Sequence, residues 1–178
     1  MWKIKAARPE FAIVIASLFL LLAFNATLWQ HLFNITDNHD GSTVLRFAFG
    51  LIVLCIFNIV LTLLAFKSVL KPILTVLFFL SAAVSYFMDQ YGVLIDVGMF
   101  RNVAETNITE AQGLLSFKLL GYIVVLGLLP SVVLWKTPIN YRRWPRELLS
   151  KAIVLAGCGF VVGSITLLNY QGLSSLLR

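Results

Sequence analysis

Apolar residues are grouped along this chain into five long runs, and shorter polar or charged segments separate each run from the next. A helix needs roughly 20 apolar residues to cross a bilayer core about 30 Å thick, and it satisfies its own backbone hydrogen bonds in lipid. The pattern therefore predicts an all-α membrane protein. We expect five transmembrane helices, at about residues 11–33, 44–66, 70–90, 117–135 and 150–168.

The connection between the third and fourth runs is too long to be a structureless loop in a compact protein. Asp96 can cap the start of a helix, and Gly113 can end one. Between them, apolar residues such as Val97 and Phe100 are interleaved with polar ones, a pattern that suits a helix lying in the membrane interface. We therefore predict an interfacial helix over about residues 96–113.

Lysine and arginine residues predict the orientation, because cytoplasmic loops of membrane proteins carry an excess of both. A cytoplasmic N-terminus and five spans place most of them on the inner side and put the interfacial helix and the C-terminus on the outer side. The residues assigned to the inner side are Lys3, Lys5, Arg8, Lys67, Lys71, Lys136, Arg142, Arg143, Arg146 and Lys151, against Arg46, Arg101, Lys118 and Arg178 on the outer side.

The composition agrees with a membrane protein, since 60% of the 178 residues are hydrophobic and only 12% are charged. Soluble domains are about 45–50% apolar and about 25% charged. The net charge of +6 does not indicate nucleic-acid binding, because the basic residues lie between apolar runs and form no recognition module. The chain as a whole, residues 1–178, is therefore read as one transmembrane domain with no globular enzyme domain.

A few polar and small residues fall inside the predicted spans. Asn58 and Thr62 are neutral, and such residues usually hydrogen-bond across helices in membranes. Gly159 and Gly163 form a small-residue pair that lets another helix approach closely. In a bundle of five helices, we expect that partner to be internal.

Three polar residues in the predicted interfacial helix could bind a ligand. Asn102, Thr106 and Glu110 are four residues apart and therefore share one stripe of a helix. The carboxylate could attract the ammonium of a zwitterionic lipid headgroup, while the amide and hydroxyl donate to phosphate oxygens. The alternative is a solvated face of a surface helix, and spacing alone favours that alternative.

No catalytic or metal-binding motif is recognisable. The chain has no GxSxG, HExxH or glycine-rich phosphate loop, and its two cysteines, Cys55 and Cys158, lie apart in apolar runs. His31 and His39 are near two aspartates, but their spacing matches no known ligand set. We therefore predict no catalytic residue, no metal site and no cofactor within this chain.

Several short motifs resemble those of the phosphoethanolamine lipid A transferases, the family that includes the mobile colistin-resistance enzymes. The resemblance rests on the stretch from Ser85 to Asp96, SYFMDQYGVLID, followed by Met99 and the Asn102, Thr106 and Glu110 stripe. It extends along nearly the whole chain through the segments NIVLT at 58–62, LKPI at 70–73 and LPS at 129–131.

This resemblance implies the five-helix anchor of a bacterial inner-membrane enzyme. In the family, a periplasmic zinc-dependent domain transfers phosphoethanolamine from phosphatidylethanolamine to lipid A, which gives resistance to polymyxins such as colistin. That catalytic domain and its zinc are expected to be absent from residues 1–178, so this chain alone should be inactive. Its expected partners are phosphatidylethanolamine, lipid A, other membrane lipids and its own catalytic domain, and no nucleic acid.

The resemblance also assigns substrate binding to Asn102, Thr106 and Glu110, since these residues fall on family positions thought to line the lipid-headgroup site. A small membrane transporter is an alternative function, although no charged residue falls in the middle of a predicted span. A membrane scaffold protein is another. A scaffold, however, has no need of an amide, a hydroxyl and a carboxylate on one helical stripe.

Overall fold

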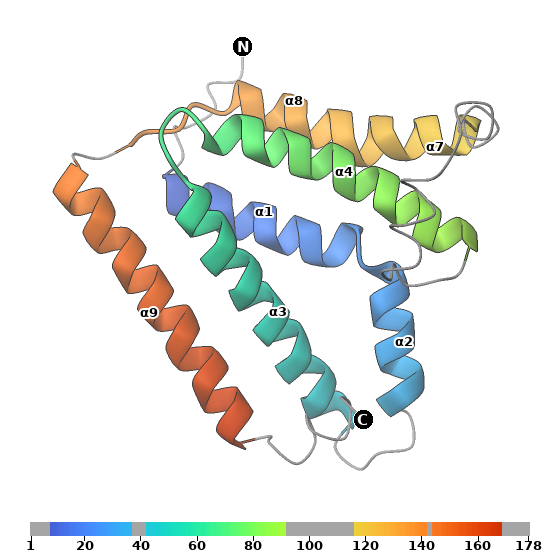
Figure 1. Ribbon diagram of the computed structural model, residues 1–178, viewed down its shortest axis with the longest axis horizontal. Helices are drawn as coiled ribbons and strands as arrows, with labels where there is room; N and C mark the ends of the chain where they lie inside the picture. The colour runs from blue at the N-terminus through green and yellow to red at the C-terminus, as the bar shows by residue number, and fades with distance from the viewer. Residues whose placement is uncertain (1–7, 37–41, 92–115, 142–143, 169–178) are drawn as a thin grey trace, which may run out of the picture.

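The computed structural model describes residues 8–36, 42–91, 116–141 and 144–168. The regular elements within these ranges are helices, as predicted (Figure 1). In chain order they are α1 (Pro9–Ala23), α2 (Ala26–Thr36), α3 (Ser42–Leu64), α4 (Leu70–Tyr91), α7 (Phe117–Tyr122), the π-helix η1 (Ile123–Leu128), α8 (Leu129–Lys136) and α9 (Trp144–Leu168).

Four helices of the described chain are long and apolar enough to cross a membrane: α3, α4, the continuous helix 117–136, and α9. The bent pair α1 and α2 makes a fifth candidate span. The predicted interfacial helix over 96–113 lies outside the described residues. We call the side where α3 begins and α4 ends the outer side, following the orientation predicted from the basic residues, and the opposite side the inner side.

The first predicted span, 11–33, is not one straight helix. It breaks after Ala23, and α2 continues at an angle of 62° to α1. Two side chains bond to carbonyl oxygens in the last turn of α1: Asn25 Nδ2 donates to Leu20 O (2.8 Å), and Trp29 Nε1 donates to Leu21 O (3.2 Å). Because the carbonyls at a helix end need such partners, these bonds stabilise the break.

The fourth span contains a π-helical segment that the apolar pattern did not predict. The π-helical segment Ile123–Leu128 ends two residues before Pro130. The backbone N–H of Leu129 donates to Val124 O, five residues back. Proline has no N–H and clashes with the preceding turn of an α-helix, so a wider turn before it accommodates the ring. The span therefore remains continuous from Phe117 to Lys136.

The core lies where α1, α3 and α4 meet. Its buried side chains include Ile13 of α1, Leu61 of α3, and Leu74 and Phe78 of α4. Phe19 packs edge-on against Phe78, with ring centroids 5.5 Å apart. Helix η1 covers another face of α4, so α4 is the central helix of this part of the bundle (Figure 1).

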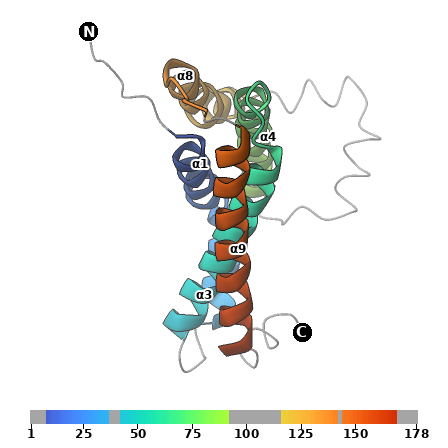
Figure 2. The same ribbon diagram turned by 90° about the vertical axis from the view of Figure 1, so that its left-hand side faces the viewer.

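Helix α9 lies at the edge of the bundle and packs along α3 (Figure 2). Midway along this contact, the side chains of Cys55 of α3 and Cys158 of α9 lie near each other. The expected internal partner for Gly159 and Gly163 is not found in the part of the chain described here, because a Cβ added at either glycine would meet nothing within 4 Å. Within the described ranges, both glycines are exposed and face away from α3, so their partner stays a prediction.

The intramembrane polar residues also bond differently from the expectation. Asn58 Nδ2 donates to Leu54 O, one turn back in its own helix (3.0 Å). The hydroxyl of Thr62 is buried and has no partner within the described ranges. The predicted hydrogen bonds across helices are thus replaced at Asn58 by a local bond, an option open to short polar side chains in any helix.

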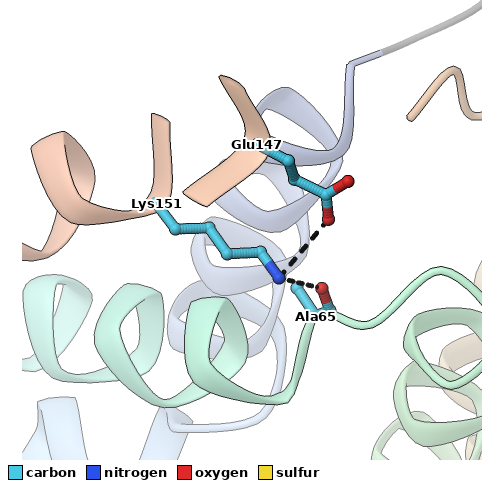
Figure 3. Close-up of polar contacts among 3 residues, drawn as sticks. All are labelled: Ala65, Glu147 and Lys151. Carbon is cyan, nitrogen blue, oxygen red and sulfur yellow. Dashed lines mark hydrogen bonds and ion pairs between the residues drawn. The ribbon is translucent and has the colours of Figure 1, made fainter. Parts of the chain in front are cut away.

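At the inner end, Lys151 joins α9 to α3 (Figure 3). Its Nζ donates to the carbonyl oxygen of Ala65, just beyond the end of α3, and lies 3.4 Å from Glu147 Oε1. It also lies 4.9 Å from the centre of the Phe66 ring. A cation at a helix C-terminus is favourable because the last carbonyls carry partial negative charge. Near this anchor, burial and then the negative charge of Glu147 raise the pKa of Tyr141.

A second lysine, Lys71 of α4, joins α4 to the end of the fourth span. Lys71 Nζ donates to Thr137 O (2.9 Å) and Trp135 O (3.3 Å), at the end of α8. The Trp135 indole in turn donates to Thr75 Oγ1 (3.0 Å) on the next turn of α4. Lysines at the inner side therefore hold the ends of two spans in place as well as contributing to the charge bias.

Candidate functional site

The three residues predicted to bind substrate, Asn102, Thr106 and Glu110, lie outside the described residues, so their arrangement stays a prediction. The structure does describe both ends of the segment that carries them. Helix α4 leads into this segment at Tyr91, and Ser116 follows it as the N-cap residue of α7.

The two ends are joined directly by a hydrogen bond. Tyr86, in the last turns of α4, has its hydroxyl oxygen 2.7 Å from Ser116 Oγ. Ser116 Oγ also accepts the backbone N–H of Leu119 (3.1 Å), which caps the start of α7. An N-cap serine satisfies a helix donor that otherwise has no partner. The helix cap and the junction between the two ends thus depend on the same hydroxyl group.

Asp89 forms a second junction at the same place. Its Oδ2 accepts the Tyr122 hydroxyl of α7 (2.9 Å), and its Oδ1 accepts the Thr27 hydroxyl of α2 (3.1 Å). A carboxylate near the C-terminus of a helix is unfavourable for the helix dipole. Two hydroxyl donors offset that cost, because hydrogen bonds to a charged group are stronger than neutral ones. Asp89 of α4 therefore connects α4 to both α2 and α7.

Aromatic contacts complete this region, which we call the outer polar cluster: Thr27, Tyr86, Asp89, Ser116 and Tyr122. The Tyr86 ring is buried and meets the Tyr122 ring edge-on, with centroids 5.6 Å apart. Edge-on aromatic pairs contribute about 0.5–1.5 kcal/mol beyond their buried area. The cluster is thus held by both apolar and polar contacts, at the end of α4 and the start of α7.

The chemistry of the cluster is that of a support and not of a catalytic centre. It offers one carboxylate and four hydroxyl groups, and both carboxylate oxygens already accept hydroxyl hydrogens. Within the described ranges, no three His, Cys, Asp or Glu side chains gather as a metal ion would require. The family resemblance assigns the zinc to the periplasmic catalytic domain and not to these helices.

Comparison with known proteins finds similarity to phosphoethanolamine transferases. The family model described as "Phosphoethanolamine transferase EptA/EptB" matches residues 53–178. The chain is 28% identical over 152 residues to the phosphatidylethanolamine transferase Mcr-2 of Escherichia coli, and this alignment covers 85% of the chain and 28% of the relative. It is 28% identical over 172 residues to Mcr-1 of Escherichia coli, covering 94% of the chain and 30% of that relative.

A solved structure has the same fold. The lipooligosaccharide phosphoethanolamine transferase A (EptA) from Neisseria meningitidis, an integral membrane protein, superposes with a TM-score of 0.85 at 24% sequence identity. The superposition covers 93% of this chain and 31% of the EptA chain. At this identity the likeness establishes the fold, including the helical membrane architecture.

The helices and this likeness define a multi-pass integral membrane protein. The family model matches well over half of the chain, and the chain therefore belongs to the EptA/EptB phosphoethanolamine transferase family. It corresponds to the N-terminal membrane domain of these proteins and spans about three tenths of the length of Mcr-1, Mcr-2 and EptA. The predicted family and the all-α membrane fold are thus confirmed.

Sequence reasoning did not identify the outer polar cluster as a unit. Tyr86 and Asp89 both lie in the SYFMDQYGVLID stretch that carried the resemblance, so a signal was present. Their partners Thr27, Ser116 and Tyr122 are 30 to 62 positions away in the chain. No local pattern pairs residues at such separations, and only the packing of α2, α4 and α7 brings them together.

Proposed function

We propose that this chain is the membrane domain of a phosphoethanolamine transferase that moves phosphoethanolamine from phosphatidylethanolamine to lipid A. The observation that carries the proposal is the family match over residues 53–178. The names of Mcr-1 and Mcr-2, phosphatidylethanolamine transferases, supply the donor class. Modification of lipid A in this way would confer resistance to polymyxins such as colistin.

In this proposal the domain has two tasks. It anchors a zinc-dependent catalytic domain at the outer surface of the bacterial inner membrane, and it helps to bind the donor lipid. Donor binding is assigned to Asn102, Thr106 and Glu110. The outer polar cluster supports that assignment, because it joins the two ends of segment 92–115 and so restricts where the segment can lie.

The described residues offer no group for the transfer step itself. Phosphoryl transfer needs a nucleophile and strong electrostatic stabilisation of the transferred group. The outer polar cluster contains hydroxyl groups but no general base beside them other than Asp89, whose two oxygens are already bonded. The chain of residues 1–178 should therefore transfer no phosphoethanolamine by itself.

The proposed orientation has the N-terminus in the cytoplasm and the C-terminus in the periplasm. The lysine anchors at Lys71 and Lys151 support it, since both lie at the side where basic residues gather. Cysteine labelling from the periplasm, with the two native cysteines replaced, should modify a probe at Ser174 and spare one at Arg143. The reverse labelling pattern would contradict the orientation.

Single alanine substitutions of Asn102, Thr106 and Glu110 in the full-length enzyme test donor binding. Hydrogen bonds to charged groups contribute about 1.5–3 kcal/mol, and 1.4 kcal/mol is about tenfold in binding. Each substitution should therefore lower the amount of phosphoethanolamine-modified lipid A, measured by mass spectrometry, by about tenfold. Glu105→Ala is the matched control, because residue 105 is expected about 100° around the helix from Thr106, the middle of the stripe. Unchanged activity of all three variants at equal membrane abundance would show that the stripe is only a solvated face.

A further inference from the structure

A groove of about 380 Å³ lies between α3 and α4, beside the end of α1. Apart from Asn25 and Ser81, the side chains that line it in the described chain are apolar. Leu61 is buried in its floor, whereas Val60 and Leu80, one on each wall, are about half exposed. The groove is therefore open along its length to the surroundings of the bundle, which in a membrane are lipid chains.

The groove exists because α3 and α4 diverge. Residues 65–69 join the two helices at the inner side, and the helices separate toward the outer side (Figure 1). Helix α1 packs against both but ends at Ala23, where the chain turns by 62° into α2. Asn25, at this turn, is part of the groove wall, and its bond to Leu20 O (2.8 Å) fixes the wall in place.

The groove has the length of one leaflet. On α4 its lining runs from Leu77 to Met88, which is about 16 Å along the helix axis. Half of a hydrocarbon core is about 15 Å thick. Met88 is the outermost of these residues, and α4 ends three residues later at Tyr91. The dimensions therefore fit one extended acyl chain of a lipid in the outer leaflet.

The outer end of the groove meets the outer polar cluster. Met88 is followed directly by Asp89, and Asn25 lies two residues before Thr27. The hydrogen bond from the Thr27 hydroxyl to Asp89 Oδ1 (3.1 Å) therefore lies at the mouth of the groove, between α2 and α4. A lipid with its chain in the groove has its headgroup at this cluster, where α4 leads into segment 92–115.

We propose that the groove binds one acyl chain of the phosphatidylethanolamine donor while its headgroup is held by the stripe at residues 102–110. This inference rests on the proposed function and extends the donor site from the headgroup to the lipid body. Lipid chains are as apolar as the groove, so the chain gains no hydrophobic free energy by leaving the bilayer. The contribution of the groove is positioning, because a fixed chain keeps the headgroup at the cluster.

Photolabelling of the full-length enzyme in a phosphatidylcholine bilayer tests the inference. The probe is phosphatidylethanolamine with a diazirine in the middle of one acyl chain. It should label the peptides of α3 and α4 that contain Val60 and Leu80. Excess dioleoyl phosphatidylethanolamine should lower this labelling several-fold, and excess dioleoyl phosphatidylglycerol, which has the same chains, should lower it much less. Absent labelling, or equal competition by the two lipids, would overturn the proposal.

Two variants separate the chain from the headgroup. Leu80→Trp and Val60→Trp each fill the groove from one wall and should raise the KM for dioleoyl phosphatidylethanolamine several-fold, with kcat unchanged. The KM for dihexanoyl phosphatidylethanolamine should stay the same, because its chains are too short to reach Leu80, about 12 Å from Met88 along the helix axis. Val76→Trp is the matched control, since Val76 is as exposed as Leu80, one turn away on α4, and does not line the groove.

The kinetic outcomes also distinguish this inference from the proposed function. If the unmodified enzyme transfers no phosphoethanolamine from either donor, the proposed function is wrong. If it transfers from both donors and the two groove variants keep the original KM for the dioleoyl lipid, the function stands and the groove does not hold the donor chain. An equal rise in Val76→Trp, or an equal rise for the dihexanoyl lipid, would overturn the inference in the same way.

Discussion

The hydroxyl groups of Tyr86 and Ser116 are 2.7 Å apart and join the end of α4 to the start of α7. The segment between them, 92–115, carries the stripe proposed to bind the donor headgroup. This hydrogen bond therefore joins the two residues between which the chain carries the proposed donor-binding stripe. Loosening it should affect the segment more than the rest of the bundle.

Tyr86→Phe removes that hydroxyl and retains the ring that packs against Tyr122. One hydrogen bond contributes about 1 kcal/mol, so the fold should survive. Hydrogen–deuterium exchange should become several-fold faster for amides in 92–115 and stay unchanged in α3. Tyr141→Phe is the control, because its hydroxyl has no partner within the described ranges. Unchanged exchange in Tyr86→Phe would mean that the contact does not restrain the segment.

Cys55 and Cys158 should form a disulfide when the membrane is treated with a permeant oxidant. Their side chains lie near each other across α3 and α9, and a disulfide needs the two Cβ atoms within about 4.5 Å. Both thiols should then lose their reaction with maleimide while the protein stays monomeric on a gel. Cys158→Ser should keep one reactive thiol throughout. Disulfide-linked dimers, or two thiols that stay reactive, would contradict the packing of α9 on α3.

Lys151→Met should destabilise the protein more than loss of a surface lysine would. The substitution leaves Glu147 and the carbonyl of Ala65 without their charged partner in a largely buried place. The expected cost is about 1–3 kcal/mol, measured as a lower thermal unfolding temperature in detergent. Glu147→Gln should cost less, because the bond to Ala65 remains. Lys136→Met, at an exposed position in α8, is the matched control, and an equal effect of the two lysine substitutions would disprove the anchor.

The sequence predicted most of the fold because apolar runs of membrane length are a strong local signal. It did not predict the break at Asn25, since the apolar character continues through that position and the break depends on side-chain bonds to Leu20 and Leu21. The π-helical turn before Pro130 was missed for a related reason. Hydropathy reports which residues prefer lipid, and it is insensitive to how the backbone accommodates one proline.

The chemistry of single residues was harder to predict than the spans. Arg46 was assigned to an outer segment on charge alone, whereas it lies within α3 and is held by Thr36 and Phe33. Asp89 was one residue of the SYFMDQYGVLID stretch with no role of its own, and its two partners come from helices distant in sequence. Such roles depend on tertiary packing, and no spacing rule along one chain encodes them.

The central claim is that Asn102, Thr106 and Glu110 hold the donor headgroup, and its most direct test is binding of headgroups that differ only at the ammonium. Phosphatidylethanolamine and its N-trimethylated form, phosphatidylcholine, are titrated into the purified protein. The N–H donors that reach Glu110 exist only in the first lipid, so it should bind about tenfold more tightly. In Glu110→Gln this difference should fall sharply, and in Arg46→Gln it should persist. Equal affinity of the two lipids for the unmodified protein, or a difference that survives in Glu110→Gln, would contradict the account.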